Sequence, residues 1–180
     1  MLNRGFTLIE LLITICVLSI LLIFAAPSFS SLFESSRMKT AQDELMGFVI
    51  MAKSEAVFRN TPVYLHLRDL NDSDPMKRCM VLSLSNTISD CTTNVVSVLS
   101  GRTFEGITLA QSYPENTIEI NHVSGWPKLQ SGTQDSEGYS EIGKFYVDES
   151  KKLVLKMHIT GRTQVCGDGE ALYGVQACGQ

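Results

Sequence analysis

Cysteines are the residues of this chain whose spacing most directly suggests chemistry. Cys16 lies inside an apolar run, and the other four lie in the polar remainder: Cys79, Cys91, Cys166 and Cys178. Eleven residues lie between Cys79 and Cys91, and eleven between Cys166 and Cys178. This spacing is too long for a Cys-x-x-Cys redox motif or a zinc site. Three disulfide connectivities are open. We favour Cys79–Cys91 and Cys166–Cys178 because each closes a short loop, and disulfides indicate an oxidising compartment.

No other side chains form a catalytic pattern. The histidines are far apart, and we interpret them as sheet-surface residues: His66, His122 and His158. No Gly-x-Ser-x-Gly motif or phosphate-binding loop accompanies them. One loop gathers oxygen ligands: Asp69, Asn71, Asp72 and Asp74. The EF-hand order fails there because Asp74 stands where the glycine is required, so we interpret the loop as a solvated turn. We expect no enzyme activity, no cofactor and no metal, although calcium binding by this loop stays open.

One carboxylate, Glu10, stands inside the apolar run that follows Arg4 and ends near Ala26. At the centre of a membrane-spanning helix a carboxylate costs about 3 kcal/mol on insertion scales, so it requires a reason. A secretory signal peptide is one interpretation, with Ala26-Pro27-Ser28 as its cleavage site. A plain anchor from Phe6 to Phe29 is another, since about 20 apolar residues span a bilayer. Neither interpretation gives Glu10 a role.

The segment Gly5-Phe6-Thr7-Leu8-Ile9-Glu10-Leu11-Leu12 resembles the class III signal of type IV pilins and of type II secretion pseudopilins. The resemblance implies that a dedicated peptidase cleaves after Gly5 and methylates the new N-terminal residue, Phe6. It also implies that Glu10, then the fifth residue, pairs with an N-terminal amine, which would offset the cost of burying the carboxylate. Pro27 becomes the twenty-second residue, where similar pilins carry a proline, and it should kink the helix.

The elements that would position these residues are a long helix and a series of strands. We expect a leader at 1–5, a hydrophobic transmembrane or filament-core helix at 6–29, an amphipathic helix at 30–60 and a β-rich domain at 61–180. The buried helix face recurs at steps of three and four: Met38, Ala41, Leu45, Phe48, Val49, Ala52 and Ala56. Asn60-Thr61-Pro62 should end the helix.

Alternating segments predict strands at 63–67, 79–84, 95–99, 106–109, 117–123, 142–147, 152–159 and 163–165. The polar segment 130–140 is expected to be a loop. In segment 152–159 one face is apolar, and the other, which includes Val154, is expected to be largely solvated. The fold class is therefore α+β: a pilin-like long N-terminal helix, kinked near Pro27, that packs on a C-terminal antiparallel β-sheet domain.

Two later segments, Ala52-Lys53-Ser54-Glu55-Ala56-Val57 and Gly161-Arg162, resemble the GspH/FimT family of minor pilins and pseudopilins, which includes FimU-like members. Some members of that family bind DNA through a Gly-Arg-x-Arg motif. In this chain Gln164 replaces the second arginine, and the net charge is −4. DNA contact is therefore a hypothesis for Lys152, Lys156 and Arg162, and we prefer a solvated basic face or a subunit contact.

The resemblance implies a minor pilin of a type IV pilus that contributes to the initiation of assembly near the tip. Two alternatives stay open: a GspH-type pseudopilin of a type II secretion system, and a DNA-binding minor pilin for natural transformation. Pro27 favours the pilus. The implied partners are the prepilin peptidase, other minor and major pilins, and the inner-membrane assembly machinery. The chain would cross the bacterial inner membrane once, with its domain in the periplasm, and reach the pilus on the cell surface after assembly.

Overall fold

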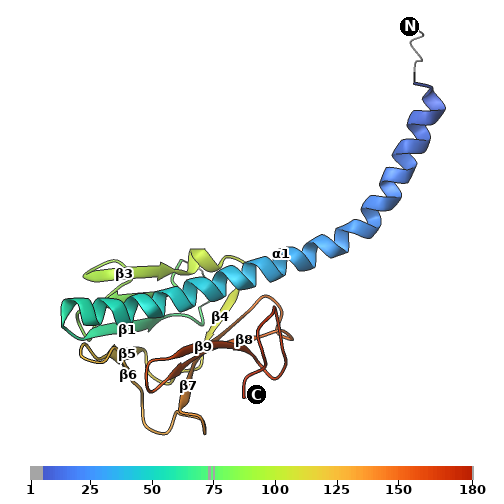
Figure 1. The fold of residues 1–180 in the computed structure, drawn as a ribbon. Helices are drawn as coiled ribbons and strands as arrows, with labels where there is room; N and C mark the ends of the chain where they lie inside the picture. The colour runs from blue at the N-terminus through green and yellow to red at the C-terminus, as the bar shows by residue number, and fades with distance from the viewer. Residues whose placement is uncertain (1–5, 73, 75, 180) are drawn as a thin grey trace. The chain divides into compact units, whose positions relative to one another are not determined.

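The structure is a computed structural model that describes residues 6–72, 74 and 76–179, and of residues 24–28 only the helical backbone. One helix, α1 (Leu8–Arg59), precedes nine strands and one short 3-10 helix, η1 (Gly101–Phe104), in the described residues (Figure 1). The chain divides after Arg37 into two compact units. This order of elements confirms the α+β class.

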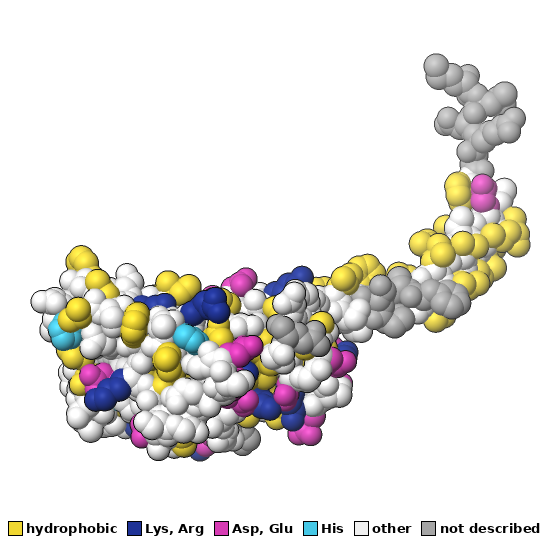
Figure 2. Space-filling model, turned by 60° about the horizontal axis from the view of Figure 1, so that its bottom comes forward, with side chains coloured by type: hydrophobic (Ala, Val, Ile, Leu, Met, Phe, Trp, Pro, Cys, Tyr) yellow, Lys and Arg dark blue, Asp and Glu magenta, His cyan; other side chains and the backbone are white. Residues whose placement is uncertain are grey.

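The first unit contains the beginning of α1, where the hydrophobic side chains have no core to enter. Those described between Phe6 and Phe33 are all exposed, including Leu18 at 57%. Hydrophobic side chains, coloured yellow, cover this part of the helix in Figure 2. Within the described part of the chain, no helix combines the length and the apolar character that are needed to cross a membrane.

The second unit begins with the rest of α1, whose predicted buried face is confirmed. All seven residues of that face are buried, among them Leu45 at 3% exposure. Ala41, Ala52 and Ala56 are small, so the helix axis can approach the strands closely. The helix ends in a Schellman arrangement: the Asn60 N–H donates to the Val57 carbonyl and the Thr61 N–H to the Ala56 carbonyl. Asn60 has a φ of 52°, which asparagine tolerates better than most residues.

Two antiparallel sheets, rather than one, complete the second unit. The larger sheet has the order β3-β2-β1-β5-β6, built from β1 (Val63–Arg68), β2 (Cys79–Ser83), β3 (Val95–Ser100), β5 (Thr117–Ile120) and β6 (Pro127–Lys128). The smaller sheet has the order β4-β7-β8-β9, built from β4 (Thr108–Gln111), β7 (Tyr139–Tyr146), β8 (Leu153–His158) and β9 (Thr163–Gly167). The last turns of α1 lie over β1 in Figure 1, and side chains from α1 and both sheets form one core.

Most predicted strands are present, with four corrections. β6 was not predicted, and β7 begins at Tyr139, inside the segment that was expected to be a loop. Val154 is buried rather than solvated, because its partner in the sheet is Cys166, which carries a disulfide. Ile159 lies beyond the end of β8 and is exposed. The strand pattern was therefore predicted better than the covering of its outer face.

Both expected disulfides are present, Cys79–Cys91 and Cys166–Cys178. The first joins the start of β2 to the loop between β2 and β3. The second joins β9 to the C-terminal segment, which also forms a parallel bridge from Ala177 to Gly167. Cys16 is a free, exposed cysteine on the first part of α1.

Candidate functional site

The N-terminal motif ends in a capped helix. Gly5, after which cleavage is predicted, lies outside the described residues, while Phe6 is non-helical and 70% exposed. The Glu10 N–H donates to the Thr7 hydroxyl at 3.3 Å and to the Thr7 carbonyl at 3.1 Å, so Thr7 caps the helix that starts at Leu8. This cap places the predicted start of the mature chain just before the first helical turn.

The Glu10 side chain is exposed and forms no ion pair with any other described residue. Glu10 lies in the first turn of α1. The carboxylate is thus available to a partner outside the described chain. The helical backbone continues through Pro27, but the side chains of residues 24–28 are not described. The predicted kink at Pro27 stays a prediction.

The basic residues near β8 lie on the outer face of the smaller sheet, where carboxylates accompany two of them, Lys156 and Lys144. The Lys156 ammonium donates to Asp135 Oδ2 at 2.9 Å, and its side chain is only 18% exposed. Partial burial alone would raise the pKa of Asp135, but the hydrogen bonds from Lys156 and from the Tyr139 and Glu137 backbone amides outweigh it and lower the pKa. Lys156 is therefore held in an internal ion pair and is poorly placed to contact a phosphate.

Lys144, on the neighbouring strand β7, is also paired with carboxylates. Its ammonium lies 2.7 Å from Asp168 Oδ2 and 3.8 Å from Glu141 Oε1. The hydrogen bond to Asp168 raises the pKa of Lys144, more than partial burial lowers it. This neighbouring pair further reduces the positive character of the face on which the predicted DNA contacts lie.

Lys152 and Arg162 contact aromatic rings instead of carboxylates. The Lys152 ammonium lies 5.0 Å from the centre of the Tyr146 ring. Arg162 donates from Nε to the Tyr139 hydroxyl at 2.7 Å, with its guanidinium carbon 5.7 Å from the ring centre. Of the three residues in the DNA hypothesis, Lys152 and Arg162 thus have no carboxylate partner among the described residues, whereas Lys156 has one.

The two later segments of the family resemblance meet in the structure. The Lys53 ammonium on α1 donates to the Gly161 carbonyl at 2.6 Å. Gly161 has a φ of +79°, and a side chain there would lie 3.1 Å from the Gly125 carbonyl oxygen, so glycine is required for two reasons. The contact fixes the turn between β8 and β9, and with it the backbone that carries Arg162. This role of Lys53 was not predicted.

The oxygens of the acidic loop accept hydrogen bonds from backbone amides. Asp72 Oδ1 accepts the Asp74 N–H at 2.8 Å, Asp74 Oδ1 accepts the Met76 N–H at 2.9 Å, and Asn71 Oδ1 accepts the Gln111 N–H at 2.9 Å. The described residues contain no group of three or more side chains arranged to hold a metal ion.

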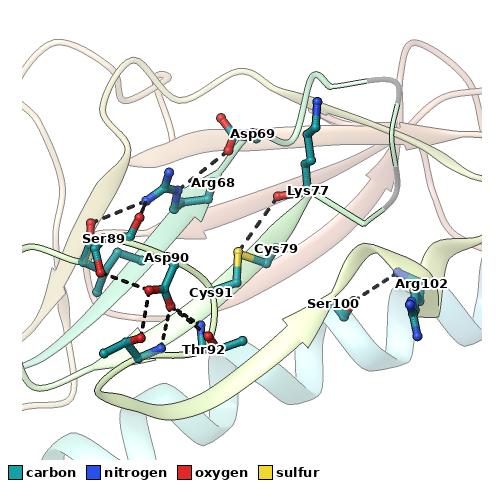
Figure 3. Close-up of a disulfide and its surroundings, with 12 residues drawn as sticks. Arg68, Asp69, Lys77, Cys79, Ser89, Asp90, Cys91, Thr92, Ser100 and Arg102 are labelled. Atoms are coloured by element: carbon teal, nitrogen blue, oxygen red, sulfur yellow. Dashed lines mark hydrogen bonds and ion pairs between the residues drawn. A yellow bond between two sulfur atoms is a disulfide. The ribbon is translucent and has the colours of Figure 1, made fainter.

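A second cluster that was not predicted surrounds the Cys79–Cys91 disulfide (Figure 3). Arg68 donates from Nη1 to the Ser89 carbonyl at 2.6 Å, reaching across to the loop between β2 and β3. The next residue of that loop, Asp90, accepts the backbone N–H and the hydroxyl hydrogen bonds of Thr92 and Thr93, which lower the pKa of Asp90 strongly. The loop is therefore tied to the sheet and hydrogen-bonded within itself.

His66, on the same face of β1, is also tied to this loop, and it is buried rather than at the sheet surface. Its Nε2 lies 3.0 Å from the Ser85 carbonyl and its Nδ1 lies 2.9 Å from the Thr117 hydroxyl. Since a carbonyl only accepts, Nε2 carries the proton and Nδ1 accepts from Thr117. Burial lowers the pKa of His66, with a smaller opposite effect from the bond to Ser85. The alternation Tyr64-x-His66-x-Arg68 was the available signal that these side chains share one face.

Comparisons with known proteins agree with the N-terminal motif and with the fold. The model of the prokaryotic N-terminal methylation motif matches residues 1–26. No curated protein matches the chain. Two crystal structures of the type IV minor pilin FimU from Pseudomonas aeruginosa are similar in fold. One has a TM-score of 0.51 and 15% identity, and covers 74% of this chain and 96% of FimU. The other has a TM-score of 0.53 and 13% identity, and covers 77% and 96%. The prepilin-type motif and the type IV pilin fold are thus both confirmed.

Proposed function

We propose that this chain, which joins a prepilin N-terminal methylation motif to the fold of the minor pilin FimU, is a minor pilin of a type IV pilus that contributes to pilus assembly near the tip. The observation that carries the proposal is that Glu10, which has no ion-pair partner among the described residues, lies in a helical segment whose described hydrophobic side chains from Phe6 to Phe33 are all exposed. In a filament of like helices, neighbouring subunits would supply a positive charge for this carboxylate and would cover this apolar surface.

Processing comes first in this proposal. The prepilin peptidase cleaves between Gly5 and Phe6 and methylates the amine of Phe6. Cleavage creates a positive charge four residues before Glu10, on this subunit and on every other pilin processed in this way. An amine of a neighbouring subunit can then approach the Glu10 carboxylate, and the pair costs far less in an apolar environment than either charge alone.

Assembly follows from burial of the apolar helix. Residues 6–29 would be held in the inner membrane before assembly and among the helices of other pilins afterwards. Each large apolar side chain that is fully covered contributes about 1.5–3 kcal/mol relative to an exposed one, so lateral packing of this segment is strongly favourable. The Glu10–amine pair adds little net energy but sets the axial register between neighbouring subunits.

DNA binding is the weaker candidate. The positions implied by the family motif lie on a face where Lys156 and Lys144 are neutralised by Asp135 and Asp168. Gln164 stands in place of the second arginine of that motif. We therefore assign Arg162 and Lys152 to protein contacts or to solvent rather than to phosphates.

A Glu10→Val substitution tests the proposal in cells that lack the native chain. We expect cleavage at Gly5 to continue, because the substitution removes an unfavourable charge from the apolar segment. Methylation of Phe6 or incorporation should fail, with a loss of at least about tenfold in the amount of this chain recovered in sheared pili. Mass spectrometry of the N-terminus and immunoblotting of the pilus fraction measure the two steps separately.

Glu44→Val is the matched control, because Glu44 is an exposed carboxylate on the same helix but inside the second unit. It should leave processing and incorporation unchanged. Normal incorporation of the Glu10→Val chain would contradict the proposed register pair. An N-terminus at a residue other than Phe6 would contradict the pilin-type processing itself.

A further inference from the structure

The outer face of the larger sheet carries two adjoining hollows that no part of the proposed function uses. One has a volume of about 300 Å³ and the other about 460 Å³, and Asn86 and Thr117 line both. Each volume falls in the range of about 300–1,000 Å³ that is usual for small-ligand sites. We call the two together the β1–β5 groove, since these adjacent strands form its floor.

The floor of the β1–β5 groove follows from strand alternation. Val63, Leu65 and Leu67 of β1 enter the core, so Tyr64, His66 and Arg68 face outward. Tyr64 is half-buried, and its ring centre lies 6.4 Å from that of His66. Its hydroxyl has no hydrogen-bond partner among the described residues. The groove therefore offers an aromatic face with a free polar tip.

One rim of the groove is rigid before any ligand arrives. This rim is the loop between β2 and β3, which begins at Leu84 and ends at Asn94. His66 holds its start through the Ser85 carbonyl, Arg68 holds its middle through the Ser89 carbonyl, and the Cys79–Cys91 disulfide holds its end. A preformed rim reduces the conformational entropy that binding would otherwise cost.

Three of the polar groups that line the groove are planar and have no partner among the described residues. The side-chain amides of Asn86 and Gln130 and the carboxylate of Glu115 form no hydrogen bond with the described residues. Each of these groups presents adjacent hydrogen-bonding positions in one plane, as donor and acceptor in the amides and as paired acceptors in the carboxylate. Such groups suit a ligand that displays neighbouring hydroxyls.

The charges at the groove largely cancel. Lys128 lies 3.5 Å from Glu119, and Arg68 lies 3.8 Å from Asp69. Glu115 leaves one negative charge, so the groove offers no electrostatic attraction for nucleic acid or for an acidic polymer. Its chemistry selects an uncharged, hydroxyl-rich ligand with an apolar face that can lie against a tyrosine ring.

We infer that the β1–β5 groove binds a neutral oligosaccharide. The C–H face of one sugar ring stacks on Tyr64, and the hydroxyls of this ring and its neighbours hydrogen-bond to Asn86, Gln130 and Glu115. This site goes beyond the proposed role in pilus assembly and does not depend on it, because it lies wholly within the second unit.

The test uses the full chain in detergent micelles on an array of immobilised sugars. The neutral probes are cellohexaose, maltohexaose and chitohexaose, the acidic probes are sialyllactose and oligogalacturonate, and a polar Ser/Asn/Thr peptide represents an extended protein segment. We expect binding to at least one neutral probe, and a weakening of at least about tenfold in Tyr64→Ala, because this variant removes both the stacking ring and its free hydroxyl.

Two further variants keep the result interpretable. Asn86→Ala changes an exposed rim residue whose side chain forms no hydrogen bond with the described residues, so it should weaken binding without changing the midpoint of thermal unfolding. Tyr146→Ala removes a half-buried tyrosine of the other sheet and should leave binding unchanged. No binding to any neutral probe, binding to the acidic probes or the peptide alone, or equal loss in Tyr146→Ala would overturn the inference.

Discussion

The two halves of α1 differ in apolar content and have opposite surroundings. Leu18 in the first half is 57% exposed, whereas Leu45 in the second half is 3% exposed. In the second half, Ala52 and Ala56 alternate with charged residues, so that one face is apolar and the other polar. In the first half, apolar residues surround the helix and Glu10 is the sole acid between Phe6 and Phe33.

The side chains of one continuous helix can therefore be buried by two different kinds of partner. The second half obtains its partners from the strands of its own chain, and its stability is a property of folding. The first half obtains none from the described chain, and in the proposed filament its burial would come from lipid or other subunits. Substitutions in the two halves should therefore affect different measurements.

A matched pair of leucine substitutions tests this division most strongly. Leu45→Ala should destabilise the second unit by about 2–5 kcal/mol, because it leaves a cavity in a close-packed core. Leu18→Ala removes the same atoms from an exposed position and should leave the unfolding midpoint unchanged. Chemical denaturation of the detergent-solubilised full chain, followed by tryptophan fluorescence, measures both, since Trp126 lies in the second unit.

Incorporation into pili should depend on Leu18 even though folding does not. The amount of the Leu18→Ala chain in sheared pili should fall although its unfolding midpoint is unchanged, because the lost contacts are between subunits. Equal destabilisation of folding by the two substitutions would show that the first half packs on its own domain, and the division between the halves would fail.

The next largest effect is expected from removing a disulfide, which tests whether the second unit needs this covalent bond for its stability. Replacing Cys166 and Cys178 together by serine should lower stability by about 3 kcal/mol, since the bond closes a short loop in the unfolded chain. The C-terminal segment should then become sensitive to protease before the rest of the domain. Resistance of that segment equal to the parent chain would show that the bridge from Ala177 to Gly167 is sufficient without the covalent bond.

The smallest expected effect concerns His66. Its pKa is lowered in the folded state, so on acidification the unfolded chain takes up the proton first. Folding stability should therefore fall as the pH drops through the ordinary histidine range and below it. His66→Gln retains a donor for Ser85 and an acceptor for Thr117 but does not titrate. The urea midpoint of the parent should fall more than that of the variant between pH 7 and pH 5, and parallel curves would contradict this role.

Local patterns were sufficient to predict the helix face, most strands and the processing motif. The steps from Met38 to Ala56 repeat with the period of the helix, and the segment from Gly5 to Glu10 is recognisable as a contiguous motif. The division of the strands into two sheets was not predictable, because it depends on which distant strands pair. β6 is too short to show alternation, and Val154 is covered through its pairing with the disulfide-bonded Cys166, which the alternation within one strand does not indicate.

The ties made by His66, Arg68 and Lys53 were missed for a different reason. Their partners are the backbone carbonyls of Ser85, Ser89 and Gly161. Every residue type supplies such an acceptor, so the sequence contains no complementary side chain to indicate the contact. The sequence could have indicated only that three polar side chains of β1 alternate with the core residues of that strand.

The position of the cysteines also affects the order of events during oxidation. Each bond joins residues only 12 positions apart. The entropic cost of closing a loop rises with the logarithm of its length, so both native bonds are cheaper to form than any of the crossed alternatives. A newly exported chain can therefore make its correct bonds at random encounter, before the sheets exist, with little need for a catalyst that reshuffles wrong ones.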